Sequence, residues 1–126
     1  MNEYNITDRC FKFAVRIVKL CRVLEKQDRV SRTLANQLLR SGTSVGANVE
    51  EAQAGQSKSD FIAKMSISRK EARETLYWLR LLVESDSVES DKVSEIIKEA
   101  DELVRILTAI VKSAQTRSAG GMNAKG

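Results

Sequence analysis

Carboxylate and hydroxyl side chains recur at helical spacing in two stretches of the chain. In the first stretch polar groups follow one another at steps of three, four and three residues, and the set is Ser41, Ser44, Asn48 and Glu51. Steps of this size put side chains on one face of a helix. In the second stretch Glu71 and Glu74 lie three residues apart. Such groups serve as ligands in carboxylate metal centres and, with an activating base, as parts of hydrolytic sites.

The absence of histidine limits this chemistry. None of the 126 residues is a histidine, which removes the imidazole base, the serine–histidine pair and the histidine metal ligand. Ser41 and Ser44 have no visible activator. Di-iron bundles use Glu-x-x-His pairs, where this chain has Glu71-x-x-Glu74, so a metal site that includes Glu51 is a remote alternative. We expect no enzymatic activity, with no catalytic residue, no metal site and no cofactor.

A structural polar network is the favoured interpretation of these residues. Buried polar groups must be hydrogen-bonded, and a satisfied network fixes helix register or forms a subunit contact. Asn48 or Ser44 is expected to pair with Glu71, and Lys64 with Glu51. Trp78 suits either a subunit interface or the edge of the bundle core. The candidate set is Arg40, Ser41, Ser44, Asn48, Glu51, Lys64, Glu71, Glu74 and Trp78.

Hydrophobic periodicity predicts the elements that position these groups. Proline is absent and glycine occurs only six times, which favours long helices. Apolar residues recur at three- and four-residue steps in four segments, at about 7–26, 30–53, 60–83 and 90–116. Short connections make neighbouring helices antiparallel. The expected fold is therefore an all-α, up-down-up-down four-helix bundle over residues 1–116.

Several local features accompany this expectation. Thr7 and Ser59 are the expected caps of the first and third helices. Gly42 and Gly46, four residues apart, suggest close helix approach within one continuous second helix, and the alternative is a break near Gly42. The first helix is expected to bury a broad apolar face that includes Phe11. We expect the Gly/Ala/Ser-rich tail, 117–126, to be disordered.

The two cysteines and the hydropathy of the chain indicate the cellular compartment of the protein. Cys10 and Cys21 fall on one predicted helix, with Cα atoms about 16 Å apart, too far for a disulfide. They are expected to be reduced thiols. No apolar run reaches the length of a membrane span, and the polar amino terminus does not resemble a signal peptide. These features predict a cytoplasmic protein.

Positive charge is concentrated on the first helix. Residues 8–26 hold six bases and two acids, a net +4 that equals the charge of the whole chain. The bases share the face opposite the apolar one, and they are Arg9, Lys12, Arg16, Lys19, Arg22 and Lys26. A row of cations suits the phosphates of a polyanion. The alternative is an ordinary solvated face, neutralised by the acidic fourth helix.

A second basic stripe is expected on the third helix. Arg69, Arg73 and Arg80 form it, with Lys70 and Tyr77 on the adjacent face. Tyr77 suits stacking on a base, although packing against a partner explains it equally well. The bases of both stripes, without Lys70, are the candidate nucleic-acid-binding residues.

Three ordered motifs resemble a known family. They read Leu38-Leu39-Arg40-Ser41-x-x-Ser44-Val45-x-x-Asn48-Val49-x-Glu51-Ala52, Ser57-Lys58-x-Asp60-Phe61-x-x-Lys64-Met65 and Lys70-Glu71-Ala72-x-Glu74-Thr75-x-Tyr77-Trp78-Leu79. They resemble the bacterial four-helix-bundle proteins encoded in intervening sequences of 23S ribosomal RNA genes. The resemblance covers about residues 8–115. It implies an up-down bundle that assembles as a homopentameric ring, in a family whose molecular function is mostly unassigned.

A more distant similarity is to the accessory protein of diversity-generating retroelements. That protein is a basic pentamer that works with a reverse transcriptase and nucleic acid. Its C-terminal tail is typically basic, whereas the tail here has only Arg117 and Lys125. The resemblance implies nucleic acid, RNA or DNA, or a protein such as a reverse transcriptase as partner. The lack of a long apolar run predicts no membrane partner.

The function expected from these observations is a non-catalytic, homo-oligomeric scaffold associated with nucleic acid, such as ribosomal RNA. Five copies would carry about +20 in formal charge, which strengthens attraction to a polyanion. The alternative is a purely structural protein-interaction module.

Overall fold

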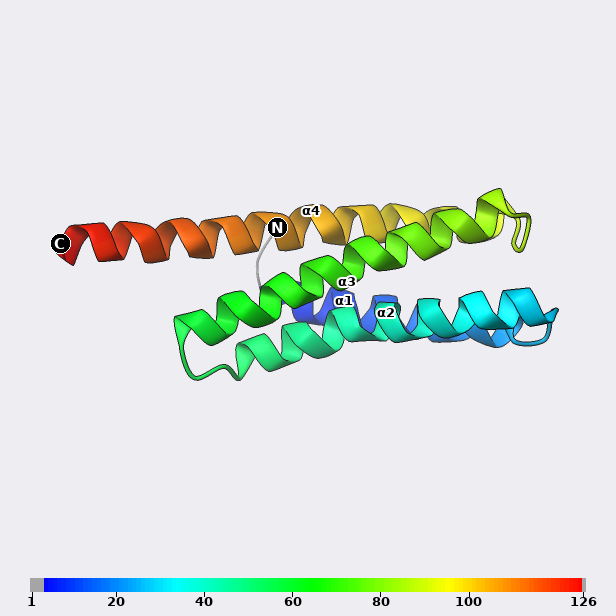
Figure 1. Ribbon diagram of the computed structural model, residues 1–126, viewed down its shortest axis with the longest axis horizontal. Coiled ribbons are helices and arrows are strands. Elements are labelled where there is room, and N and C mark those ends of the chain that lie inside the picture. The colour runs from blue at the N-terminus through cyan, green and yellow to red at the C-terminus, as the bar shows by residue number, and fades with distance from the viewer. Residues whose placement is uncertain (1–3, 126) are drawn as a thin grey trace.

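The computed structural model describes residues 4–125, and side chains from Ile6 to Arg117. It contains four helices, α1 (Tyr4–Leu24), α2 (Arg29–Gln53), α3 (Lys58–Glu84) and α4 (Ser90–Lys125). They run in alternating directions and are joined by short turns, and the carboxyl end of α4 extends beyond the α2–α3 turn (Figure 1). The expected all-α, antiparallel four-helix bundle is confirmed. Each helix packs against its neighbour in sequence, and α1 also contacts α4.

Two helix starts are fixed by side-chain caps. Asp28 accepts a hydrogen bond from the Ser31 amide at 2.9 Å, which caps α2. Ser57 accepts one from the Asp60 amide at 3.1 Å, so Ser57 and not Ser59 caps α3. Each bond satisfies an amide that has no partner within the helix.

The first helix begins earlier than predicted. It starts at Tyr4, which places the expected cap, Thr7, inside the helix. The reason lies in packing, because Ile6 is buried on the same face as Cys10 and Phe13. Steps of four and three residues bring these side chains together only if the helix already includes Ile6.

The α3–α4 turn closes α3 in a Schellman arrangement. The Ser87 amide donates to the Leu82 carbonyl at 2.9 Å, and the Asp86 amide donates to the Val83 carbonyl at 3.1 Å. Asp86 has φ 61, the left-handed conformation that this motif requires and that usually selects glycine. The turn therefore satisfies carbonyls that would otherwise lack partners at the end of α3.

The core runs along the inward faces of all four helices. On α1 these residues are Ile6, Cys10, Phe13, Ile17, Cys21 and Leu24. Phe11 was expected among them, but it is 62% exposed. The centre of the buried face lies near Ile17, and Phe11 lies about 120° away around the helix. The predicted apolar face of α1 was too broad.

Glycine allows α1 and α2 to approach each other closely. A Cβ atom on Gly42 would lie 2.8 Å from Cγ2 of Ile17, and one on Gly46 would lie 3.3 Å from the backbone oxygen of Cys10. Hydrogen is the only side chain that fits at Gly42 without a shift of Ile17. The structure therefore agrees with the expected close approach, and α2 runs without a break through both glycines.

The tail departs from the expected disorder. The structure continues α4 to Lys125, past the predicted end near Thr116, and Gly126 lies outside the described residues. A helix that is already formed gains one hydrogen bond for each added residue without a new nucleation cost. The segment contains no proline to end the helix, and the glycines at 120 and 121 weaken the helix without blocking its hydrogen bonds.

Candidate functional site

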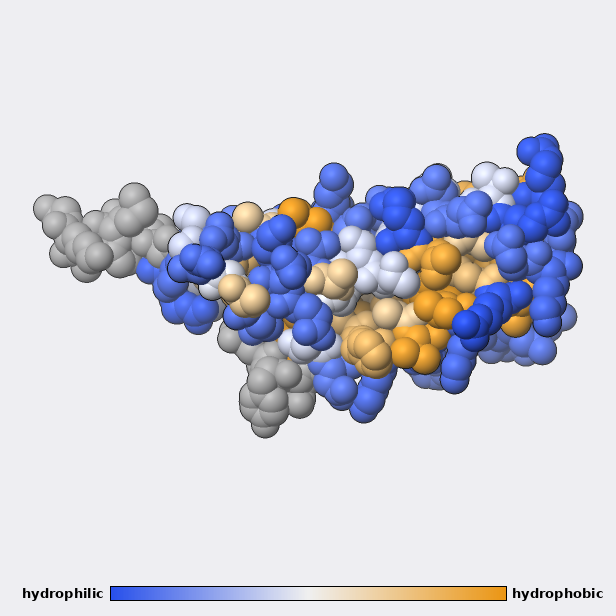
Figure 2. All heavy atoms as spheres, turned by 90° about the horizontal axis from the view of Figure 1, so that it is seen from below, coloured by the Kyte–Doolittle hydropathy of each residue, from blue (hydrophilic) through white to orange (hydrophobic). Residues whose placement is uncertain are grey.

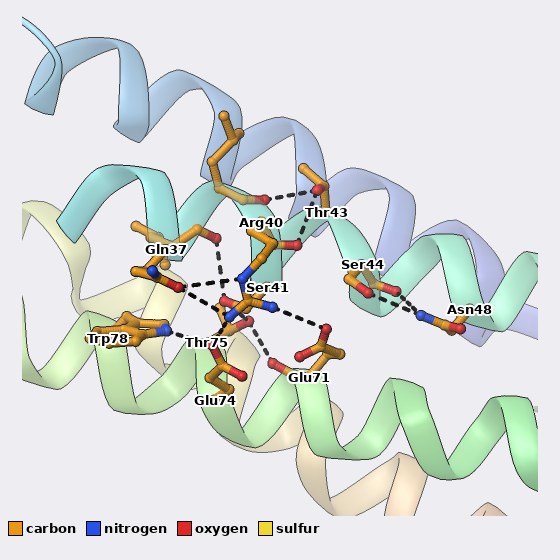
Figure 3. Close-up of polar contacts among 12 residues, drawn as sticks. Gln37, Arg40, Ser41, Thr43, Ser44, Asn48, Glu71, Glu74, Thr75 and Trp78 are labelled. Atoms are coloured by element: carbon orange, nitrogen blue, oxygen red, sulfur yellow. Dashed lines mark hydrogen bonds and ion pairs between the residues drawn. The ribbon is translucent and has the colours of Figure 1, made fainter. Parts of the chain in front are cut away.

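Arg40 joins α2 to α3 in an ionic network (Figure 3). Its Nη1 lies 3.3 Å from Oε2 of Glu71, and its Nη2 pairs with Oε2 of Glu74. The side-chain oxygen of Gln37 accepts two weak bonds from the same guanidinium, at 3.3 and 3.4 Å. The indole of Trp78 donates to Oε2 of Glu74 at 2.9 Å. The structure thus brings together four of the predicted network residues.

Buried hydroxyl groups continue the network into the core. The hydroxyl oxygens of Ser41 and Thr75 lie 2.9 Å apart, and Thr75 also donates to the Glu71 carbonyl at 2.7 Å. The Ser68 hydroxyl donates across the interface to the Val45 carbonyl at 2.7 Å. No buried side-chain nitrogen or oxygen of the described residues lacks a partner. These bonds favour a single register between α2 and α3.

Thr75 was missed by the sequence reasoning. It lies seven residues after Ser68 and four after Glu71, which places it on the inward side of the same helix. The signal is a pair of small hydroxyl residues, Ser68 and Thr75, two turns apart, whereas the predicted α3 partners for the polar face of α2 include only Lys64, Glu71 and Glu74.

Two predicted pairs in this region are wrong. The Asn48 amide donates within α2, to the carbonyl and hydroxyl of Ser44 at 2.9 and 3.0 Å, and not to Glu71. Glu71 is instead held by Arg40. Glu51 is exposed, Lys64 is half-buried, and they do not form an ion pair.

The carboxylates do not converge as a metal site would require. Glu71 and Glu74 both face the guanidinium of Arg40, and Glu51 points to solvent on another helix. Within residues 4–125, no three acidic or thiol groups lie close enough together to hold a metal ion.

The basic face of α1 divides into two parts. Arg9 lies between α1 and α4, with its Nη2 2.6 Å from Glu99 and 3.2 Å from Glu102. The hydrogen bond to Glu99 is the main cause that raises the pKa of Arg9. Lys12 pairs with Asp8 at 3.0 Å. These two cations are therefore neutralised locally, Arg9 by the acidic fourth helix.

The other cations of α1 and its following turn have no acidic partner among the residues that the structure describes. They are Arg16, Lys19, Arg22 and Lys26, and all four are exposed. Because all four side chains are exposed, this row faces solvent.

The stripe on α3 is separate from the row on α1. Arg73 and Arg80 are exposed, Arg69 is half-buried, and none has an ion pair in the described part of the chain. Helices α1 and α3 do not contact each other, so they occupy diagonal positions in the bundle. The two predicted stripes therefore do not form one continuous surface on a single subunit. Tyr77 is exposed and packs edge-on against Trp78, with ring centroids 5.1 Å apart.

A family model confirms the expected relationship. The model of the 23S rRNA-intervening sequence protein matches residues 2–109 of the chain. The chain belongs to this family. The match includes the α1 cations and the whole Arg40 network, so both features lie within the family's own domain.

A solved structure supports the same placement in the 23S rRNA-intervening sequence protein family. It is a protein of unknown function from the S23 ribosomal protein family of Bacteroides thetaiotaomicron, 40% identical to this chain. The alignment covers 85% of this chain and 98% of that protein, with a TM-score of 0.78. A search of curated proteins found no match. Among the described residues, no helix has the length and apolar character needed to cross a bilayer.

Proposed function

We propose that this member of the 23S rRNA-intervening sequence protein family is a non-catalytic, homo-oligomeric scaffold that associates with nucleic acid through backbone phosphates. The observation that carries the proposal is the row of four exposed cations on α1 and its following turn, which have no acidic partner in the described part of the chain. Like charges on one helix repel each other. A phosphate backbone relieves that repulsion without any need to read base edges.

Oligomerisation would strengthen the attraction of this cationic surface for a polyanion. The proposed assembly is the homopentamer that the family resemblance implies. A ring of identical subunits repeats the cationic row at regular positions, and the total formal charge of about +20 raises the local concentration of a polyanion. The half-buried Trp78 and the neighbouring exposed Tyr77 on α3 provide an aromatic surface of the kind enriched in subunit contacts. The proposed compartment is the cytoplasm, where RNA, DNA and a reverse transcriptase are all accessible partners.

A mobility-shift titration at several salt concentrations tests the proposal. A structured RNA and a DNA duplex are the probes, and the triple variant Arg16→Gln, Lys19→Gln, Lys26→Gln removes three of the cations. The matched control is Lys92→Gln, Lys98→Gln, Lys112→Gln, which removes the same charge from exposed positions on α4. We expect the α1 variant to weaken binding at least tenfold and to flatten the salt dependence, by about 0.9 in log–log slope for each lost contact to duplex DNA.

The outcomes separate the candidate functions. Binding that the α1 variant weakens and the α4 variant leaves nearly unchanged supports the proposal. Equal weakening by both variants means that net charge alone attracts the nucleic acid, which contradicts the assigned surface. Absence of binding at low salt contradicts the nucleic-acid role and favours a protein-interaction module.

A further inference from the structure

The subunit exposes large apolar side chains on two surfaces that lie on different helices. One is the outer side of the α1–α2 hairpin, where Figure 2 shows apolar residues gathered between charged ones. Phe11 is 62% exposed there, and Val15 and Leu39 are each 38% exposed. The other is the outer side of α3, where Ile67 is 43% and Tyr77 is 56% exposed. Large apolar side chains exposed together mark interaction surfaces on soluble proteins.

The α1–α2 surface is concave and contains two hollows, which together form the groove. The smaller hollow, of about 370 Å³, is lined by Phe11, Ala14, Thr43, Gly46, Ala47 and Glu50. The larger one, of about 550 Å³, is lined by Val18, Cys21, Arg22, Glu25, Lys26 and Leu39. Along α1 their centres are about ten residues apart, or roughly 15 Å. An occupant of both hollows must therefore present two bulky side chains at about this separation.

The outer side of α3 has the same spacing. Ile67 and Tyr77 are ten residues apart on one helix, which corresponds to roughly 15 Å along its axis. Their directions around the helix differ by about 80°, so both side chains project from one outer side, which we call the α3 ridge. A helix that presents bulky side chains in this way is a common occupant of an apolar groove.

Each hollow also matches one of these side chains in chemistry. The smaller hollow has the small residues Ala14 and Ala47 in its lining, which suit the compact aliphatic side chain of Ile67. The larger hollow combines Leu39 with charged groups. A tyrosine such as Tyr77 suits this mixture, because its ring packs on apolar residues while its hydroxyl bonds to a polar partner.

The charges beside the smaller hollow are complementary to those beside Ile67. Glu50 lines this hollow, is exposed, and has no ion pair among the described residues. Lys64 and Lys70 lie about one turn on either side of Ile67, and neither forms an ion pair in the part of the chain that the structure describes. Docking of Ile67 in the hollow brings these lysines toward Glu50, and opposite charges across an interface favour and orient association.

The groove and the α3 ridge must meet between two copies of the chain. Within one subunit α1 and α3 do not contact each other, so the ridge does not reach the groove beside it. Two different surfaces on one chain form a heterologous contact, which is the kind that closes a ring. A groove that contacted a second groove would close at two copies and would place hollow against hollow.

We infer that the α1–α2 groove of one subunit binds the α3 ridge of a second copy. This inference rests on the homo-oligomer proposed above, and it adds which two surfaces meet. The contact is compatible with the nucleic-acid surface, because Arg16 and Lys19 line neither hollow and stay exposed.

Sedimentation velocity of the full-length protein over a range of concentrations tests the inference. The groove variant is Leu39→Glu with Ala47→Glu, which places an acid in each hollow. The ridge variant is Ile67→Glu with Tyr77→Ala. The matched control is Val30→Glu, a 56% exposed apolar position on α2 that lines neither hollow. Circular dichroism checks that each variant remains folded.

The expected result has two parts. The groove variant and the ridge variant should each need at least tenfold more protein than the native chain for half-assembly, and Val30→Glu should assemble as the native chain does. An equimolar mixture of the two variants should form a one-to-one heterodimer and no larger species. The reason is that the groove variant keeps an intact ridge and the ridge variant keeps an intact groove, so only one contact can form.

Three outcomes would overturn the inference. A native oligomer that survives in both variants contradicts the assigned surfaces, while the proposed homo-oligomer stands. Disruption by the groove variant alone, with no heterodimer in the mixture, makes a second groove the occupant. A native protein that remains monomeric at about 100 µM contradicts the homo-oligomer itself and leaves the groove to another protein. The nucleic-acid role is decided separately, by the mobility-shift titration.

Discussion

The hydroxyl groups of Ser41 and Thr75 meet 2.9 Å apart inside the α2–α3 interface, although 34 residues separate them in the sequence. Both side chains are fully buried. Thr75 also bonds to the Glu71 carbonyl, and Glu71 in turn binds Arg40. One polar chain therefore connects the buried centre of the interface to its exposed edge, and each member depends on the position of the next.

We predict that Thr75→Val lowers the free energy of unfolding by about 1–3 kcal/mol, because it keeps the volume but leaves the buried Ser41 hydroxyl without its best partner. The double variant Ser41→Ala, Thr75→Val should cost less than the two single changes together. Urea unfolding of the four proteins in a double-mutant cycle measures this coupling. Additive effects would mean that the two hydroxyls do not interact in the folded protein.

The glycines of α2 give a second prediction. Gly42→Ala should destabilise the protein by about 1–3 kcal/mol, because the new methyl group overlaps Ile17 in a fully packed region. This loss exceeds the gain of about 1 kcal/mol from the higher helix propensity of alanine. The control is Asn36→Ala, at an exposed position of the same helix, where only propensity acts and stability should rise slightly. Thermal unfolding of both variants checks the difference in sign, and a stabilised Gly42→Ala would contradict the close approach.

The sequence predicts the helices of this protein better than it predicts the contacts between them. Helical periodicity was sufficient to predict four helices and the approximate bounds of α2 and α3, because long amphipathic patterns depend on local chemistry. The pair formed by Arg9 and Glu99 joins residues 90 positions apart. Nothing in either local pattern distinguishes Arg9 from the exposed cations that follow it.

The wrong predictions at helix ends and for surface residues have the same cause as the missed long-range contacts. Ser57 and Ser59 are both acceptable caps by residue type, and only the turn geometry decides between them. Phe11 was assigned to the core because it is apolar, yet the rotation of α1 about its axis is set by its contacts with two other helices. Such choices depend on tertiary packing, which one sequence does not display.

The left-handed residue in the α3–α4 turn allows a stabilising change. We predict that Asp86→Gly raises the free energy of unfolding by up to about 1 kcal/mol, since glycine adopts positive φ without a steric penalty. For a domain of this size the melting temperature should rise by about 3–6 °C. The same substitution at Asp91, in the first turn of α4, should lower it because glycine weakens a helix. A melting temperature that falls with Asp86→Gly would show that the aspartate side chain stabilises the turn by more than its left-handed backbone conformation costs.

The two buried thiols predict how stability depends on pH. Burial raises the pKa of Cys10 to about 12 and that of Cys21 to about 11, whereas an exposed thiol has a pKa of about 8.5. Because the folded values are the higher ones, the folded state holds these protons more tightly. Their contribution to stability is complete below about pH 8.5 and is lost as the pH rises toward 11–12.

Urea unfolding at pH 7.5 and pH 10 should therefore show a loss on the order of 1 kcal/mol per thiol. The double variant Cys10→Ala, Cys21→Ala is the control, since it is less stable at both values but should lose less between them. The difference between the two proteins isolates the contribution of the thiols. Equal losses in both proteins would show that the thiols ionise freely in the folded state. Rapid reaction of the native protein with a thiol reagent at pH 8 would contradict their burial independently.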